Sequence, residues 1–142
     1  AVAVTYADLL GLDPLMCFKG METFGHGMGS KLGTCGAISG AIFLAGFVSS
    51  TGNMDDDKTN KSKKVSYDLA AKITEEFYQI NHTVTCSDLK DVKGGLFRSC
   101  LDCIADAARL VEKYVLPEYF TKWENVKKIK CWKNVKKMKF FR

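Results

Sequence analysis

Residues 34–49 have the sequence TCGAISGAIFLAGFVS, which contains no charged residue. Small and aliphatic side chains cover nearly every face that a helix of this length would present, so the segment predicts a helix that is buried on all sides. Gly36 and Gly40 stand four residues apart, as do Ala37 and Ala41, and these small side chains leave room for close helix packing. We therefore expect residues 34–49 to form the central helix of the fold.

Helical patterns also flank this segment. Asp13 followed by Pro14 predicts a helix start, because a carboxylate caps free N–H groups and proline fits the first helical position; this helix should end near Thr23. Another helix should end near residue 10, and two more should span about residues 64–79 and 96–116. Each of the last two helices has an apolar stripe that we expect to face the core. The stripe of the helix over 64–79 is Val65, Leu69, Ile73, Phe77 and Ile80, and that of the helix over 96–116 is Phe97, Leu101, Ile104, Ala108, Val111 and Val115. The predicted fold class is all-α, a compact bundle of about five helices around the apolar central helix.

Composition fits one folded domain with a distinct tail. The 142 residues are 46% hydrophobic and 26% charged, which excludes a largely disordered chain. Residues 117–142 hold nine Lys or Arg and two Glu, whereas residues 1–116 hold more acidic than basic residues. The net charge of +5 therefore belongs to the tail and gives no general case for nucleic-acid binding. We expect a helical cysteine-containing domain over 1–116 and a basic, aromatic-rich extension over 117–142.

Cys35 carries the strongest chemical signal. It follows a glycine-rich loop, FGHGMGSKLG over residues 24–33, and stands in the first turn of the apolar helix. Free N–H groups and the positive end of the helix dipole favour a thiolate there, which a nucleophile or a metal ligand requires. His26 lies inside the loop, within reach of a ligand near Cys35. The alternative is a small buried cysteine without a chemical role.

Other cysteines are candidates for the same site. Cys100 and Cys103 are three residues apart and share one face of a predicted helix, where two sulfurs can bind one metal or cluster. Cys86 stands in a predicted loop. The spacing matches neither a zinc finger nor a ferredoxin, and the absence of a following histidine excludes c-type haem attachment. Core packing remains the alternative, and Cys17 and Cys131 fit no cluster.

The stretch FGHGMGSKLGTCGAISGA over residues 24–41 resembles the C-GCAxxG-C-C family of redox-active proteins. The hallmark of that family is a glycine-rich loop followed by Cys-Gly-Ala-x-x-Gly, a motif that begins here at Cys35. Two later family cysteines match Cys86 and Cys100, and the resemblance extends over about residues 6–116. The first family cysteine has no counterpart ahead of that range, and the basic tail lies outside the pattern.

The resemblance implies redox or metal chemistry at clustered cysteines. It makes Cys35 the reactive residue, and the implied metal ligands are Cys35, Cys86, Cys100 and the additional Cys103. The loop residues expected to contact a cofactor are Gly25, Gly27, Gly29, Gly33, Gly36 and His26. An iron–sulfur cluster used for electron transfer is the first expectation, because thiolates are its ligands. Thiol-based redox chemistry, structural zinc, non-covalent haem and the absence of any cofactor stay open as alternatives; a related domain in split-Soret cytochromes is the reason to name haem.

These expectations describe an electron carrier or redox subunit rather than a stand-alone enzyme. The expected partners are a redox protein and a second copy of the chain in a homodimer. A different hypothesis is an interaction module whose lysine-rich and aromatic tail binds an anionic membrane surface, nucleic acid or a partner protein, with nucleic acid the least favoured. The longest apolar stretch, residues 37–48, is shorter than the roughly 20 residues of a membrane span, and no signal peptide is visible, so we expect a cytoplasmic protein.

Overall fold

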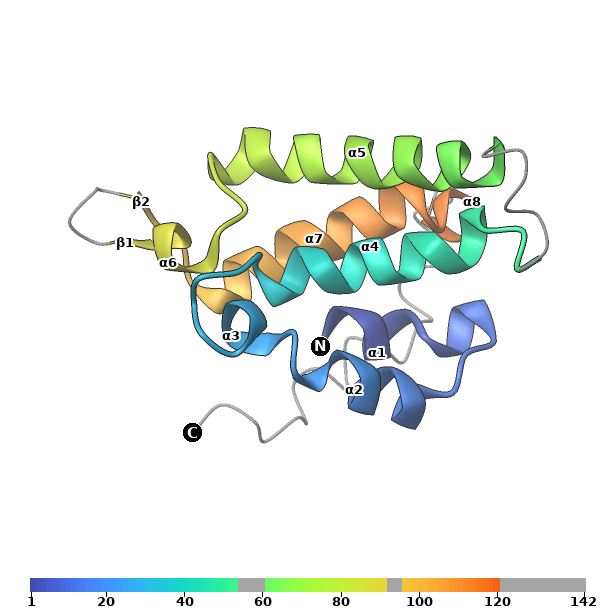
Figure 1. Cartoon of the computed structure of the whole chain (residues 1–142), viewed down its shortest axis with the longest axis horizontal. Helices are drawn as coiled ribbons and strands as arrows, with labels where there is room; N and C mark the ends of the chain where they lie inside the picture. Colours follow the sequence, from blue (N-terminus) through green and yellow to red (C-terminus); the bar gives the residue numbers. More distant parts are fainter. Residues whose placement is uncertain (54–60, 92–95, 121–142) are drawn as a thin grey trace.

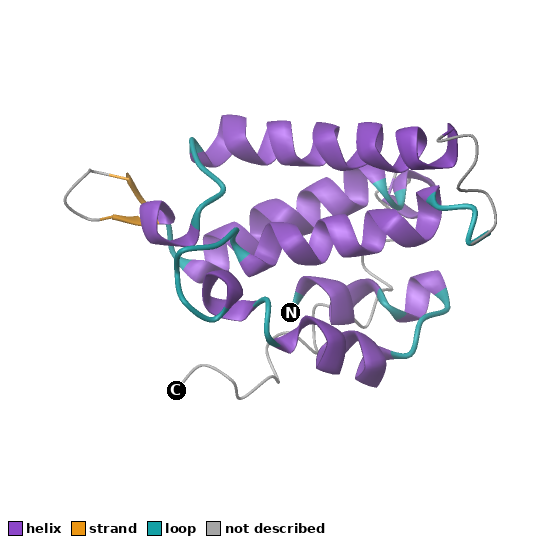
Figure 2. Cartoon of the chain, in the orientation of Figure 1, coloured by secondary structure: helices purple, strands orange, loops and turns teal. Residues whose placement is uncertain are grey.

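The computed structural model describes residues 1–53, 61–91 and 96–120 (Figure 1). The chain is mostly helical, which confirms the predicted fold class (Figure 2). Its elements are α1 (Val2–Tyr6), the 3₁₀ turn η1 (Asp8–Leu10), α2 (Pro14–Glu22), α3 (Gly25–Met28), α4 (Gly36–Ser49), α5 (Lys61–Asn81), α6 (Cys86–Leu89), β1 (Lys90–Asp91), β2 (Leu96–Phe97), α7 (Cys100–Tyr114) and α8 (Pro117–Phe120). The two short strands pair antiparallel.

Helix α4 is the central element, as its sequence predicts. Ile38, Ala41 and Leu44 on this helix have no solvent exposure. Burial of a large aliphatic side chain such as Ile38 or Leu44 stabilises the fold by about 1.5–3 kcal/mol. Helix α4 packs against α5, α7 and α1, and Figure 1 shows α4 and α7 side by side between α5 on one side and α1 and α2 on the other.

Helix α2 begins where the sequence predicts. The Asp13 carboxylate accepts a hydrogen bond from the N–H of Leu15 at 2.8 Å, and Pro14 occupies the first helical position. Cys17 is the one buried residue of this helix, which packs against α1. Helix α2 therefore lies on the outside of the bundle, and α1 separates much of it from the core.

Helix α7 begins at Cys100 rather than at residue 96. Residues 96–97 pair with β1 instead, and Ser99 caps the helix: the Asp102 N–H donates to Ser99 Oγ at 3.1 Å, and an Asp102 carboxylate oxygen accepts from the Ser99 N–H at 3.2 Å. The prediction that Phe97 and Leu101 face the core is wrong, since each is 60% exposed. The core-facing residues of α7 are Cys103, Ala107, Leu110 and Val111.

The stripe predicted for α5 is buried only in its middle. Ile73 and Phe77 are fully buried, but the predicted core residues Val65 and Ile80 are 58% and 43% exposed. Val65 lies in the first part of the helix, and Ile80 lies one residue before its end. Phe77 and Asn81, four residues apart, are both fully buried, so the last turn of α5 still packs on the core and Ile80 lies to one side of the buried face.

A buried polar network fixes the orientation of α7. Asp106 is 4% exposed and Asn81 is fully buried. The Asn81 amide donates to Asp106 Oδ2 at 3.3 Å, and Arg98 Nε donates to Asn81 Oδ1 at 2.8 Å. The guanidinium groups of Arg98 and Arg109 pair with the two oxygens of the Asp106 carboxylate. Because a buried carboxylate is costly unless it is paired, these partners hold Asp106 inward and set which residues of α7 face the core.

The end of the described chain adds one more short helix. Pro117 follows the end of α7 and is the first residue of α8, a helical position that proline favours. Residues 121–142, which include Cys131 and most of the predicted basic extension, lie outside the described residues, so the tail hypotheses stay predictions. Within the described part of the chain, no helix combines the length and the apolar character needed to cross a bilayer.

Candidate functional site

The glycine-rich loop turns left-handed at α3. His26, Gly27, Met28 and Gly29 all have positive φ angles, of 55°, 60°, 59° and 75°. Non-glycine residues in this region cost roughly 1–3 kcal/mol each, so the surroundings must hold His26 and Met28 in place. Gly27 is also required sterically, because a Cβ atom at this position would lie 2.4 Å from Cys86 Cβ and 3.3 Å from Cys86 Sγ. The loop backbone therefore packs directly on Cys86.

Main-chain hydrogen bonds join this loop to the segment before α6. Thr34 and Thr85 form an isolated antiparallel bridge. The Cys35 N–H donates to the Val84 carbonyl at 2.8 Å, and the Cys86 N–H donates to the Gly33 carbonyl at 3.0 Å. One cysteine follows each bridged threonine, so the bridge brings Cys35 and Cys86 to neighbouring positions although they are far apart in the sequence.

Cys35 lies at the N-cap of α4, not inside its first turn as the sequence predicts, because α4 begins at Gly36. The backbone N–H groups of Ala37 and Ile38, at the start of α4, are close enough to its sulfur to favour the thiolate. Gly36 is needed here, since a Cβ atom would lie 2.6 Å from the Phe24 carbonyl oxygen. Free N–H groups at a helix start stabilise a thiolate, as the sequence analysis expects.

Cys103, from the first turn of α7, is the residue that affects the ionisation of Cys35 most strongly. Its hydrogen bond to Cys35 is the largest of the effects that lower the pKa of Cys35 from 9.0 to about 6; the N–H groups of Ala37 and Ile38 and the charge of Lys90 act in the same direction, and burial opposes them. The same hydrogen bond, with burial, raises the pKa of Cys103. The pair therefore shares one proton, which resides on Cys103.

Cys86 and Cys100 complete the group of sulfurs. Burial raises the pKa of Cys86, and the electrostatic effect of Cys35 adds to it. Cys86 is 6% exposed, whereas Cys100 is exposed. All the described cysteines are free thiols, including Cys17, which is buried in α2 and does not line the site.

Lys90 places a positive charge beside these sulfurs. It lowers the pKa of Cys35 and moderates the raised pKa values of Cys86 and Cys103. Its ammonium donates to the Arg98 carbonyl oxygen, and the Arg98 side chain is held by the network around Asp106. Lys90 is not among the site residues predicted from the sequence. It stands four residues after Cys86, and this spacing indicates that the two side chains share one face of a helical turn.

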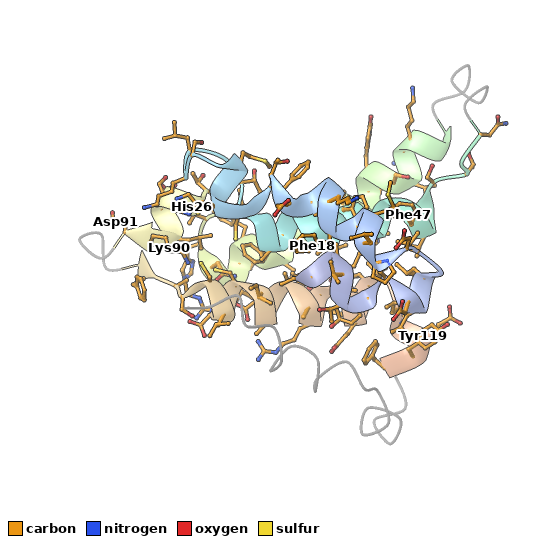
Figure 3. All side chains as sticks on the ribbon, turned by 90° about the horizontal axis from the view of Figure 1, so that it is seen from below. Phe18, His26, Phe47, Lys90, Asp91 and Tyr119 are labelled. Carbon is orange, nitrogen blue, oxygen red and sulfur yellow. The ribbon has the colours of Figure 1, made fainter. Side chains whose placement is uncertain are left out.

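A cavity of about 660 Å³ opens beside Cys35. Of the predicted site residues, those that line it are Cys35, Cys86, Cys100, His26, Gly25, Gly27 and Gly36. Cys103, Gly29 and Gly33 do not line it. Gly33 instead serves the site through the carbonyl that accepts from Cys86, and Gly29 ends α3 in a left-handed conformation. Figure 3 shows the side chains of His26 and Lys90 towards one end of the molecule and Phe18, another lining residue, nearer the middle.

The predicted metal ligands do not all converge. Among the side chains that the structure describes, no group of three or more Cys, His, Asp or Glu residues is placed to hold a metal ion. Iron–sulfur or zinc ligation by the four cysteines therefore stays a prediction. The arrangement that is present places a thiol of lowered pKa, and a second thiol that interacts with it, beside a cavity.

One family model matches this chain. The family is described as "Putative redox-active protein (C_GCAxxG_C_C)", and its model matches residues 1–114, from the chain start to the end of α7. All four cysteines of the site lie inside the match. No solved structure matches the chain.

Proposed function

This chain belongs to the C_GCAxxG_C_C family of redox-active proteins, and we propose that it performs thiol–disulfide exchange, with Cys35 as the attacking thiol and Cys103 as the second thiol of the pair. The observation that carries the proposal is the proximity of the two thiols, since each is the largest influence on the pKa of the other. The proposal rests equally on position, because Cys35 lines a cavity and Cys103 lies behind it without solvent exposure. An incoming disulfide therefore meets Cys35 first.

The exchange has two steps. The Cys35 thiolate attacks one sulfur of a disulfide substrate; the bond between Cys35 and this sulfur forms, the substrate S–S bond breaks, and the other half leaves as a thiolate. Cys103 then gives its proton to the departing thiolate and attacks Cys35, which releases the second half. The protein loses two electrons and forms the Cys35–Cys103 disulfide, and the substrate gains them as one thiol and one thiolate, which takes its proton from water. A dithiol reductant reverses both steps and restores the protein.

The pKa values of the two cysteines support this order of events. A pKa of about 6 keeps Cys35 largely ionised at pH 7, so the attacking form is present before the substrate arrives. The raised pKa of Cys103 keeps this thiol protonated until Cys35 has been consumed. Once Cys35 is bonded to substrate sulfur its negative charge is gone, and the main cause of the raised pKa of Cys103 goes with it.

Mass spectrometry of variants tests the proposal. Wild-type protein treated with a small disulfide should form a Cys35–Cys103 disulfide and release both halves of the reagent. Cys103→Ser should stop at the mixed disulfide on Cys35, whereas Cys35→Ser should lose the rapid reaction. Cys17→Ser is the matched control and should behave as wild type, because Cys17 is outside the site. A disulfide mapped between Cys35 and another cysteine would refute the assignment of Cys103.

An iron–sulfur cluster or another metal is the second candidate. It is favoured by one observation: Cys35, Cys86 and Cys100 come from three different segments and line one cavity. The described side chains do not form a ligand group as they stand, so we derive no step through a metal. Iron, zinc and acid-labile sulfide should be measured in protein purified without oxygen, together with the visible spectrum. Iron and sulfide lost in Cys35→Ser but retained in Cys17→Ser would replace thiol exchange by electron transfer through a cluster.

A further inference from the structure

The cavity beside Cys35 has two chemically different parts. One part is apolar, and its side chains come from α1 and α2: they are Val2, Val4, Phe18 and Met21. The other part contains the sulfurs and two lysines, Lys31 and Lys90. Its volume of about 660 Å³ falls within the roughly 300–1,000 Å³ of small-molecule sites. An apolar pocket with a few polar groups at one end orients a ligand rather than only holding it.

Both lysines belong to the sulfur end of the cavity. The charge of Lys31 acts on Cys86, and that of Lys90 acts on both Cys86 and Cys35. The acidic side chain in the lining is Glu22, and it comes from α2. The charge near the reactive sulfur is therefore positive and favours a substrate with a negative group close to its disulfide.

We propose that this cavity is a substrate site for small disulfides that combine an aromatic or similarly bulky apolar body with an anionic group near the S–S bond. The inference rests on the proposed function and adds the substrate class to it. The apolar walls take the body, Lys31 and Lys90 attract the anion, and the S–S bond then lies at the sulfur end beside Cys35. A disulfide in a large folded protein does not fit inside a cavity of this size, so the substrate enters as a small molecule.

Three disulfide reagents test the two parts separately. They are 5,5′-dithiobis(2-nitrobenzoate), which is aromatic and anionic, 4,4′-dithiodipyridine, which is aromatic and neutral, and 2-hydroxyethyl disulfide, which is small and neutral. The rate of Cys35 modification is measured for each by peptide mass spectrometry and divided by the rate with N-acetylcysteine thiolate. We expect the normalised rate for the anionic aromatic reagent to exceed that for hydroxyethyl disulfide by about tenfold or more, with the neutral aromatic reagent between them.

Two variants assign the preference to the cavity. Phe18→Ser should slow both aromatic reagents by about threefold and leave hydroxyethyl disulfide unchanged. Leu15→Ser is the matched control, since Leu15 lies on the same helix, is 57% exposed and is outside the cavity lining. Lys31→Gln should slow only the anionic reagent, by about twofold, and added salt should remove this difference.

The outcomes separate this inference from the proposed function. If Cys35 shows no rapid reaction with any reagent, thiol exchange itself is wrong. If Cys35 reacts rapidly and forms the disulfide with Cys103, but the three normalised rates are equal, thiol exchange stands and the substrate class is wrong. Equal slowing by Phe18→Ser and Leu15→Ser would likewise overturn the assignment of the apolar part.

Discussion

Replacing Cys103 by alanine removes the hydrogen bond that most strongly stabilises the Cys35 thiolate. The other influences on Cys35 oppose one another, because burial raises its pKa while the N–H groups of Ala37 and Ile38 lower it. We therefore expect the pKa of Cys35 in Cys103→Ala to return from about 6 towards the ordinary 9.0. Cys103→Ser keeps a hydroxyl donor at the same place, so this variant should retain the low pKa although it cannot form a disulfide.

The change in pKa alters the reaction rate in opposite directions at low and high pH. At pH 5 the ionised fraction of Cys35 falls about 900-fold if its pKa moves from about 6 to 9.0. A more basic thiolate is intrinsically faster by about 20-fold for this change, at a Brønsted coefficient of about 0.4–0.5. Cys103→Ala should therefore react about 40-fold more slowly than wild type at pH 5 and about tenfold faster at pH 9, and the two profiles should cross between about pH 7 and 8.

The assay is the initial rate of Cys35 modification by 2-hydroxyethyl disulfide from pH 4.5 to 9.5, quenched with acid and read on the Cys35 peptide. Wild type and Cys103→Ser should both lose rate as the pH falls through about 6, because the thiolate is then protonated. A profile for Cys103→Ala that is parallel to that of wild type at every pH would refute the hydrogen bond as the cause of the low pKa. Circular dichroism shows whether each variant remains folded.

Three further predictions concern the framework around the thiols. Gly27→Ala should destabilise the protein by at least about 2–3 kcal/mol in urea unfolding, because the new Cβ meets Cys86 within 2.4 Å, whereas Gly11→Ala, also at positive φ but in open space, should cost about 1 kcal/mol. Asp106→Ala should cost about 3 kcal/mol, since it removes an acceptor from the buried Asn81 and the ion-pair partner from Arg98 and Arg109. Asp68→Ala removes an exposed pair and should cost less than about 1 kcal/mol; equal costs would refute a stabilising role for the buried network. Lys90→Gln should raise the pKa of the reactive thiolate, which the pH dependence of its alkylation measures; an unchanged midpoint would show that this charge is screened.

The local signals in the sequence located the helices well. The uncharged run over 34–49 and the Asp13–Pro14 pair predict α4 and the start of α2, because burial on all sides and helix capping depend only on neighbouring residues. The start of α7 was not predictable in this way. Pairing of β1 with β2 is a contact between segments, and the burial of Asp106 against Asn81 rotates the helix away from the stripe that Leu101 suggests.

The candidate site was predictable as a set of residue types but not as a geometry. Cys35, Cys86 and Cys100 were singled out from the sequence, and the structure places all three on one cavity, although their chemical role stays a prediction. The sequence does not show which cysteine interacts most strongly with Cys35. It is Cys103 rather than Cys86, because of the way α7 packs against α4. The spacing of Lys90 from Cys86 indicates that the two residues share a face, but the hydrogen bond to the Arg98 carbonyl that holds the ammonium is a contact between segments.

The bridge between Thr34 and Thr85 has a consequence for how this protein can vary. The bridge consists of contacts between backbone groups. The neighbouring hydrogen bond, in which the Ser87 N–H donates to the Lys31 carbonyl at 2.8 Å, is also between backbone groups. The separation of the two cysteine-bearing turns is therefore set by the backbone, provided that Gly27 and Gly36 are retained. Substitutions at Ser87 can therefore alter reagent preference while the turns keep their spacing, whereas the positive φ of Lys31 restricts position 31 to residues that accept a left-handed backbone.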